Sequence, residues 1–286
     1  MSTVQVARST RASRIFTPLA LVVLLALATL PYWGGPGDMR LVAEMAYYLA
    51  LAMLWNLLAG YAGLVSVGQQ AYVGLGAYAF FYLTGSVGMH VYPAMALAGP
   101  IAGLISIPVA FAVFRLRGHY FAIGTLGLGI AAGELAAGWD FIGAGSGVAA
   151  PVFPDAMGSR SLFFYFVFFA ITVIAFFAYK WLYRGRFGLA INAIRDDEDK
   201  AEAMGLPTTH YKTMSWMVSA FFLGLVGGPV GLLIGFIDPR DTAFAGVTFG
   251  VWMVLMAILG GKGTIWGPVV GAIVFLIFKE VFWIYL

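Results

Sequence analysis

The chain has 286 residues, of which 62% are hydrophobic and only 10% are charged, and its formal net charge is +3. An average soluble domain carries about 25% charged residues, so this chain has too few charges to cover the surface of a soluble globule. The mean hydropathy of +0.91 is likewise too high for a soluble globule. This composition excludes a soluble enzyme, a disordered chain and a nucleic-acid-binding module. It predicts an all-α, polytopic transmembrane helical bundle that forms a single domain over residues 1–286.

Side chains that usually build catalytic or metal sites are scarce. There is no cysteine, and the three histidines are scattered without the HExxH spacing of zinc sites. A phosphate-binding P-loop requires GxxxxGK[ST], whereas Gly261-Lys262 is followed by Gly263. We therefore expect no catalytic, metal or cofactor site, and any ATP hydrolysis would take place in another subunit.

Apolar segments follow one another along the chain, and a transmembrane helix needs about 20 mostly apolar residues. The first segment, Ile15–Trp33, follows Arg8, Arg11 and Arg14, a layout also typical of secretory signals. Because more spans follow at once, we expect an uncleaved first span and about 8–10 spans in all. The others are predicted at Leu41–Ala59, Gly68–Thr84, Ala94–Phe114, Tyr120–Trp139, Leu162–Tyr183, Thr213–Phe236, Phe244–Gly260 and Ile265–Ile284.

Lysine and arginine are unevenly divided between the two sets of loops. If the N-terminus is cytoplasmic, twelve of the 16 lie on or near the cytoplasmic side. The other four are Arg40, Arg160, Arg240 and Lys279. Cytoplasmic loops of membrane proteins carry such an excess, which predicts a multi-pass protein with a cytoplasmic N-terminus.

The segment Tyr61–Ala79 is poor material for a plain spanning helix. Its glycines and polar residues are Gly63, Ser66, Gly68, Gln69, Gln70, Gly74 and Gly76. Irregular backbone is tolerated at membrane depth only where protein or a water-filled cavity surrounds it. The segment is thus a candidate broken or re-entrant helix, and the side of the C-terminus depends on it.

Several polar residues inside the predicted spans are candidates for lining a solute path. They are Asn56, Ser66, Gln69, Gln70, Thr125 and Glu134. The uncharged ones either hydrogen-bond between helices or offer the weak lining that releases a cargo easily. Glu134 lies near the end of its span, so it reaches either water or the path.

The one long charged loop, 184–212, contains ten of the charged residues. A short helix is predicted inside it, with Asp196 or Asp197 as N-cap, Gly205 as a left-handed C-cap and Pro207 beyond it. Ala201, Met204 and Leu206 would give this helix an apolar face. The loop is either a solvated connection or a docking helix for a cytoplasmic partner, and the helix alone does not decide between them.

Four segments carry a resemblance to a known family. They are GRFGLAINAIRDDEDKAEAMGLPTTHYK in the charged loop, WNLLAGYAGLVSVGQQAYVGLGAYAF at Trp55–Phe80, GHYFAIGTLGLG at Gly118–Gly129, and ILGGKGTIWGPVVGA at Ile258–Ala272. In this order they resemble Liv-type (LivM-like) branched-chain amino acid ABC transporter permeases. The sequence departs from the family pattern at Gln70 and Ile130, where a solute path would be lined.

The resemblance implies a transmembrane permease of a bacterial inner-membrane ABC importer that moves a branched-chain amino acid or a similar small amino acid or amide. It implies two ATP-binding subunits, a second homologous permease, a periplasmic solute-binding protein and lipid as partners. By the same resemblance, the ATPase-coupling residues are Asp196, Asp197, Glu198, Ala201, Glu202, Ala203, Met204 and Gly205, with Glu202, Ala203 and Gly205 as the core of an EAA-like coupling helix. The alternatives are an ion-coupled secondary transporter and, last, a membrane-embedded enzyme.

Overall fold

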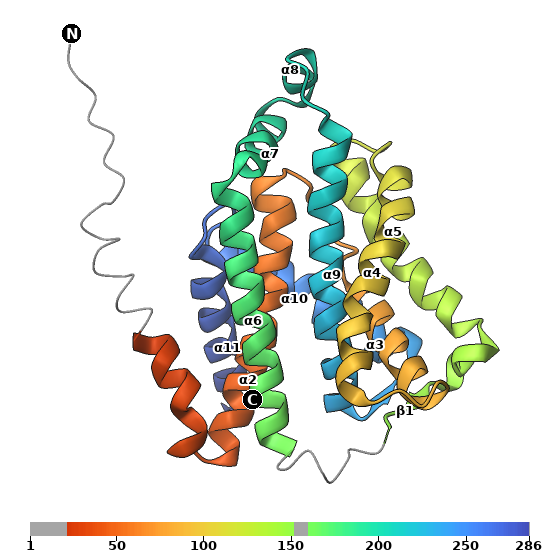
Figure 1. Ribbon diagram of the computed structural model, residues 1–286, viewed down its shortest axis with the longest axis vertical. Coiled ribbons are helices and arrows are strands. Elements are labelled where there is room, and N and C mark those ends of the chain that lie inside the picture. Colours follow the sequence, from red (N-terminus) through yellow and green to blue (C-terminus); the bar gives the residue numbers. More distant parts are fainter. Residues whose placement is uncertain (1–21, 152–159, 286) are drawn as a thin grey trace.

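A computed structural model describes residues 22–151 and 160–285 of the chain (Figure 1). Arg8, Arg11, Arg14 and the beginning of the first predicted span lie outside the described residues. Helical residues 22–29 lead into η1.

Helices make up nearly all of the described chain. In chain order, the elements are η1 (Leu30–Tyr32), α2 (Pro36–Asn56), η2 (Leu57–Tyr61), α3 (Gln70–Gly85), α4 (Val91–Val113), α5 (His119–Ala137), η3 (Asp140–Ile142), η4 (Ala144–Ser146), β1 (Val148–Ala149), α6 (Arg160–Arg184), α7 (Arg186–Asp196), α8 (Glu198–Ala203), α9 (Thr208–Ile234), β2 (Phe236–Ile237), η6 (Pro239–Ala243), η7 (Gly246–Val251), α10 (Trp252–Gly260) and α11 (Gly267–Tyr285). The strands β1 and β2 form one short antiparallel pair, with Val148 opposite Ile237.

Six helical stretches of the described residues are long and apolar enough to cross a membrane. They are Pro36–Tyr61, Val91–Val113, His119–Ala137, Arg160–Arg184, Thr208–Ile234 and Pro239–Gly260. The shorter α3 and the C-terminal α11 occupy two further predicted spans. The prediction of an all-α polytopic bundle is confirmed.

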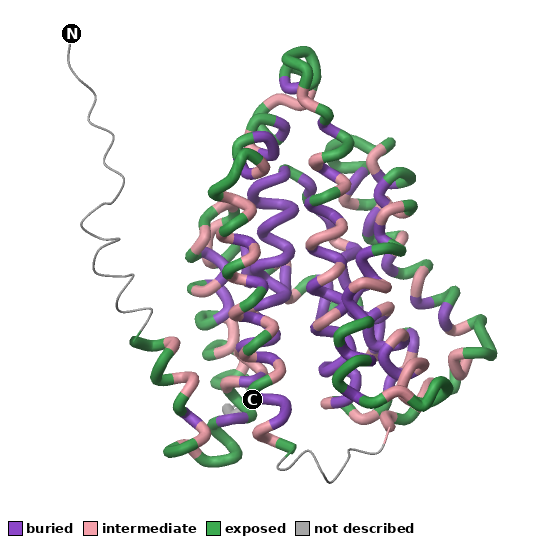
Figure 2. The backbone as a smooth tube through the Cα atoms, viewed as in Figure 1, coloured by how far each residue is buried: buried purple, intermediate pink, exposed green. Residues whose placement is uncertain are grey.

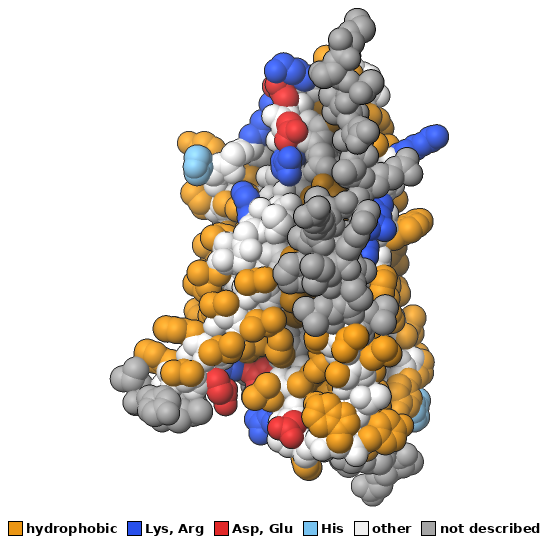
Figure 3. All heavy atoms as spheres, turned by 90° about the vertical axis from the view of Figure 1, so that its left-hand side faces the viewer, with side chains coloured by type: hydrophobic (Ala, Val, Ile, Leu, Met, Phe, Trp, Pro, Cys, Tyr) orange, Lys and Arg blue, Asp and Glu red, His pale blue; other side chains and the backbone are white. Residues whose placement is uncertain are grey.

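The bundle has two chemically distinct ends. At one of them, the α8 end, Arg117 lies 3.4 Å from the Asp199 carboxylate. At the opposite end, an Arg160 guanidinium nitrogen lies 3.3 Å from the Leu232 carbonyl oxygen. Figure 3 shows charged side chains gathered near the two ends and mostly hydrophobic side chains between them. Such a distribution fits a bundle whose middle is surrounded by hydrocarbon.

Helices α2, α3 and α9 form the buried centre of the bundle, which we call the central trio (Figure 2). Within the trio, α3 and α9 approach closely because glycines lie at their crossing. A Cβ at Gly76 or Gly227 would collide with the backbone of the facing helix, at Gly224 and at Val73 respectively. Small residues at helix crossings allow this backbone contact in membranes.

The segment Tyr61–Ala79, the candidate broken or re-entrant helix, contains a stretch that is not helical. The helix that begins at Pro36 ends at Tyr61, and α3 begins only at Gln70. Residues 62–69 between them are not helical, and Gly63 has a φ of +71°, in the left-handed region that glycine tolerates. Ser66 and Gln69 within this stretch are fully buried, so protein surrounds the irregular backbone, as membrane depth requires.

A second interruption, which we did not predict, lies in residues 239–251. Two short π-helical turns, η6 and η7, precede α10 instead of one continuous helix over Phe244–Gly260. A Cβ on Gly250 would lie 3.0 Å from Gln70 Oε1 and 3.5 Å from the Val67 carbonyl oxygen. The two interrupted spans therefore meet inside the bundle, at the start of α3.

Candidate functional site

The helix predicted in the charged loop is α8, a single six-residue turn at the tip of the bundle (Figure 1). Asp197 is its N-cap, and the carboxylate accepts a hydrogen bond from the Lys200 backbone N–H at 3.0 Å. Lys200 Nζ also lies 2.8 Å from that carboxylate. The side-chain hydrogen bond with Lys200 lowers the pKa of Asp197, and the same bond raises the pKa of Lys200.

The C-terminus of α8 ends as the sequence predicts. Gly205 has a φ of +85°, its N–H donates to the Glu202 carbonyl oxygen, and the Leu206 N–H donates to that of Ala201. These two bonds form a Schellman motif, which satisfies carbonyls that the helix leaves unpaired. Both ends of α8 are therefore fixed by local sequence.

An ion pair fixes α8 to the start of α9. Lys212 Nζ lies 2.7 Å from the Glu198 carboxylate, and the Lys212 side chain is only 9% exposed. The same ammonium group lies 5.1 Å from the centre of the Phe114 ring, a cation–π contact. Ala201 of α8 is buried as well, so α8 is held against the bundle at more than one point.

The outer surface of α8 is exposed. Asp196 lies at the end of α7 and pairs with the neighbouring Arg195 at 2.9 Å, while Glu202, Ala203 and Met204 face solvent. Met204 is 85% exposed, so its part of the predicted apolar face is open to solvent. Ala201 alone makes up the buried part of that face.

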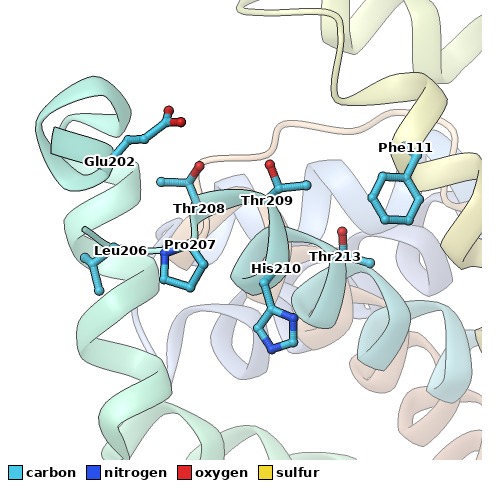
Figure 4. A pocket seen from close by; sticks show the side chains of 8 residues that line it. All are labelled: Phe111, Glu202, Leu206, Pro207, Thr208, Thr209, His210 and Thr213. Carbon is cyan, nitrogen blue, oxygen red and sulfur yellow. The ribbon is translucent and has the colours of Figure 1, made fainter. Parts of the chain in front are cut away.

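A shallow pocket of about 460 Å³ lies beside α8. Figure 4 shows Glu202 at one side of it and Phe111 of α4 at the other, with side chains from the first turns of α9 between them. The lining residues are Phe111, Glu202, Leu206, Pro207, Thr208, Thr209, His210 and Thr213. The α8 end thus offers a protruding helix next to a concave surface.

The predicted path residues occupy three different levels of the bundle. Asn56 lies near the α8 end, where it donates to the Thr264 carbonyl oxygen at 2.9 Å and accepts from the Gly263 N–H at 2.8 Å. Glu134 lies at the opposite end, where both carboxylate oxygens accept from Arg240, at 2.9 and 2.8 Å. The structure does not bring these two residues together.

Ser66, Gln69, Gln70 and Thr125 do come together, at the start of α3. Gln69 Nε2 donates to Ser66 Oγ at 3.1 Å, and Thr125 Oγ1 accepts from the Val67 N–H at 3.1 Å. Gln69 Oε1 lies 3.5 Å from Ser219 Oγ, near the middle of α9. These bonds tie the irregular segment 62–69 to α9 and α5.

Gln70 differs from its three neighbours. Its side chain is buried, with 1% of its surface exposed, yet neither its Oε1 nor its Nε2 has a hydrogen-bond partner within the described residues. Buried polar groups are nearly always hydrogen-bonded, so this amide is exceptional.

Residues 39–286 match the family described as "Branched-chain amino acid transport system / permease component". The chain is also similar to two curated proteins, each called "High-affinity branched-chain amino acid transport system permease protein LivM". It is 26% identical to the one from Salmonella typhimurium LT2 and 27% identical to the one from Escherichia coli K12. Each alignment covers 94% of this chain and 69% of the relative. No solved structure matches the chain at a significant level.

The chain belongs to this permease family. The family match covers most of the sequence, including both interrupted spans and the α8 end. The resemblance drawn from four short motifs is thereby confirmed as membership of a LivM-like permease family. The protein is a multi-pass transport permease.

Two side chains that hold charged groups of the permease in place were not predicted from the sequence. Arg240 was counted only as a loop charge, yet it pairs with Glu134 of α5. Phe114 was counted only as the end of a span, yet it holds the Lys212 ammonium. Neither partner lies close to its counterpart along the chain, so no spacing rule would have found either pair.

Proposed function

We propose that this permease is a membrane subunit of an ABC importer, which moves a branched-chain amino acid or a similar small amino acid or amide inward. Separate ATP-binding subunits would dock on residues 196–206 and supply the energy. The observation that carries the proposal is α8 itself, which is capped at both ends, exposed on its outer face and joined by an ion pair to a central helix.

The contacts of α8 give a physical route for coupling. Force applied to α8 reaches α9 through the Glu198–Lys212 pair. It also reaches the α4–α5 connection through Arg117 and Asp199. Since α9 packs along both α3 and α4, a shift of α9 would move the walls of the bundle, as alternating access requires.

The other partners follow from the family. The relatives are named as permease proteins of a branched-chain amino acid transport system. A second homologous permease, a periplasmic solute-binding protein and the bacterial inner membrane are therefore part of the proposal. The α8 end and the N-terminus would face the cytoplasm, because the basic residues concentrate on that side.

An ion-coupled carrier is less well supported. Such a carrier needs ionisable groups that are free to bind an ion near the middle of the membrane. The acids within the predicted spans of the described chain are Glu44, Glu134 and Glu280. Glu44 pairs with Lys279 and Glu134 pairs with Arg240, while the exposed Glu280 lies near the C-terminal end of α11. Both pairs lie toward the end opposite α8.

The test is charge reversal on α8. Glu202 is exposed and makes no ion pair within the described residues, so the Glu202→Lys variant should fold normally. We expect it to lose co-purification with the ATP-binding subunits and to lose stimulated ATPase activity. The matched control is Asp140→Lys, which reverses an exposed acid at the opposite end. If Glu202→Lys assembles and stimulates hydrolysis like the wild type, the docking assignment is wrong.

A further inference from the structure

The unpaired amide of Gln70 lies between two glycines that belong to different helices. A Cβ on Gly129 of α5 would lie 2.5 Å from Gln70 Nε2, and one on Gly250 of η7 would lie 3.0 Å from Gln70 Oε1. Both glycines leave room for the amide but provide no side chain that could bond to it. The polar group is therefore enclosed by surfaces that do not satisfy it.

These contacts belong to a longer interface, which we call the α5 seam. It is lined by Gln70 and Gly74 of α3, Gly129 and Gly133 of α5, and Phe244 and Gly250 of the 239–251 segment. Gly74 and Gly133 both approach the Phe244 ring. The exposed Glu134–Arg240 pair lies at one end of the seam.

The adjacent glutamine shows that the missing partners are specific to Gln70. Gln69 is equally buried, but its amide is bonded to Ser66 and Ser219. Two consecutive glutamines at the start of α3 thus have opposite environments. The Gln69 amide stabilises the fold through hydrogen bonds, whereas the Gln70 amide makes none within the described residues.

We propose that the Gln70 amide is the group that binds the solute midway along the path, and that the solute reaches it when α5 separates from α3 and η7. This inference rests on the proposed function and names the contact within it. Burying an unbonded amide is unfavourable, so the closed seam is destabilised at this point. Opening the seam to water or to a polar solute removes that destabilisation.

The chemistry of an amide selects a class of solute. A glutamine side chain offers two N–H donors and a carbonyl acceptor. A zwitterionic amino acid presents a carboxylate to the donors and an ammonium group to the acceptor. Gln70 is also the first residue of α3, and the positive end of a helix favours the carboxylate.

The first experiment replaces the amide by an apolar group of similar size. Vesicles contain the permease with its ATP-binding subunits, and radiolabelled leucine is the probe for uptake. A hydrogen bond to a charged group changes binding by roughly ten- to hundredfold. We therefore expect the Gln70→Leu variant to lose tenfold or more of its uptake, with a melting temperature equal to or above that of the wild type.

The control is Gln69→Leu at the neighbouring position, which breaks existing bonds and should lower the melting temperature. Wild-type uptake by Gln70→Leu would overturn the proposal. A lowered melting temperature for Gln70→Leu would also overturn it, because Gln70 would then have the same structural role as Gln69.

The second experiment uses the absence of cysteine from the chain. We expect the thiol of a Gln70→Cys variant to react slowly with 2-aminoethyl methanethiosulfonate at rest and faster during ATP hydrolysis. The control, Val73→Cys, lies on the same helix but is buried against Gly227 of α9, and it should stay unlabelled. A Gln70→Cys thiol that remains unreactive during hydrolysis would overturn the proposal.

The two experiments separate failure of this inference from failure of the proposed function. If the wild type takes up no leucine with its ATP-binding subunits present, the proposed transport of branched-chain amino acids fails. Labelling of Gln70→Cys does not require leucine, so it still reports whether the α5 seam opens.

Discussion

The central trio and α5 are held in the bundle by different kinds of contact. In α2 and α9, 72% and 67% of the most apolar stretch is buried inside the protein, against 28% in α5. Within the trio, α3 and α9 are joined by backbone contacts at glycines, whereas α5 is joined along a seam that encloses an amide unbonded within the described residues and ends in an exposed ion pair. We therefore expect the trio, which we call the fixed part, to stay together as one body when α8 shifts α9, and we expect α5 to separate from it.

The strongest test of this comparison adds one methyl group to each region. In the trio, the methyl of a Gly227→Ala variant would collide with the Val73 carbonyl of α3, so the two helices must separate. Overpacking of this kind costs about 3 kcal/mol, and we expect a large loss of folded protein from the membrane. Melting temperature and the yield of monodisperse protein in detergent are the measurements.

The matched substitution in α5 is Gly127→Ala, because no atom lies within 4 Å of the position of its Cβ. We expect this variant to be as stable as the wild type, or more stable by up to about 1 kcal/mol, since alanine favours a helix over glycine. Equal losses in the two variants would show that the trio is no more tightly constrained than α5.

The second test removes a buried hydrogen-bonding group from the fixed part. Asn56 bridges the end of α2 to the loop after α10, and Asn56→Leu leaves the Gly263 N–H and the Thr264 carbonyl unpaired. An unsatisfied buried group costs about 1–3 kcal/mol. Because Gly263 is half-buried and Thr264 is exposed, water satisfies part of this loss, and chemical or thermal unfolding should show a loss of about 1 kcal/mol. Asn192→Leu is the control, because Asn192 Oδ1 has no hydrogen-bond partner among the described residues and Nδ2 makes only a 3.5 Å contact.

A smaller change in stability but a clear change in transport is expected at α5. The Glu134→Cys and Arg240→Cys pair, joined by a flexible bifunctional thiol reagent that reduction can cleave, would fasten α5 to the 239–251 segment. We expect uptake to stop in the cross-linked protein and to return after reduction. Each single variant treated with the same reagent is the control. Undiminished uptake by the cross-linked protein would mean that α5 does not need to move.

Local chemistry explains which features could be predicted from the sequence. The α8 helix follows from a capping Asp197 and a left-handed Gly205, both of which act over a few residues. The break at 62–69 follows from glycine and polar residues clustered in an apolar chain. The break at 239–251 was not predicted, although Pro239, Arg240, Asp241, Gly246 and Gly250 lie within it. Its packing against Gly133, Gly74 and Gln70 became visible only in the structure.

The same reasoning limits what could be predicted of the site. Sequence identified Gln69 and Gln70 together as polar residues in a span, but it could not tell a bonded amide from an unbonded one. That difference depends on Ser66, which is three residues away, and on Ser219, which is 150 residues away. The contact with Ser219 in particular is set by tertiary structure alone.

The smallest expected effect concerns α8, which belongs to neither region and is held by short-range bonds. The pKa of Asp197 is lowered in the folded protein by its hydrogen bonds with Lys200. Its unfolded value is about 3.9. A lowered folded pKa adds stability that is fully present above the unfolded pKa and is lost as the pH falls through the folded value. We therefore expect α8 alone to loosen below about pH 4.

Hydrogen exchange of the α8 amides across this pH range, corrected for intrinsic rates, is the measurement. An Asp197→Asn variant keeps a capping side chain, since asparagine is as good an N-cap as aspartate, but it loses the titration. Its exchange should therefore show no extra step below pH 4. The exposed position of α8 means that only its own amides should respond, while those of the central trio stay protected. A step of equal size in the Asn variant would show that the Asp197 cap is not the cause of the loosening.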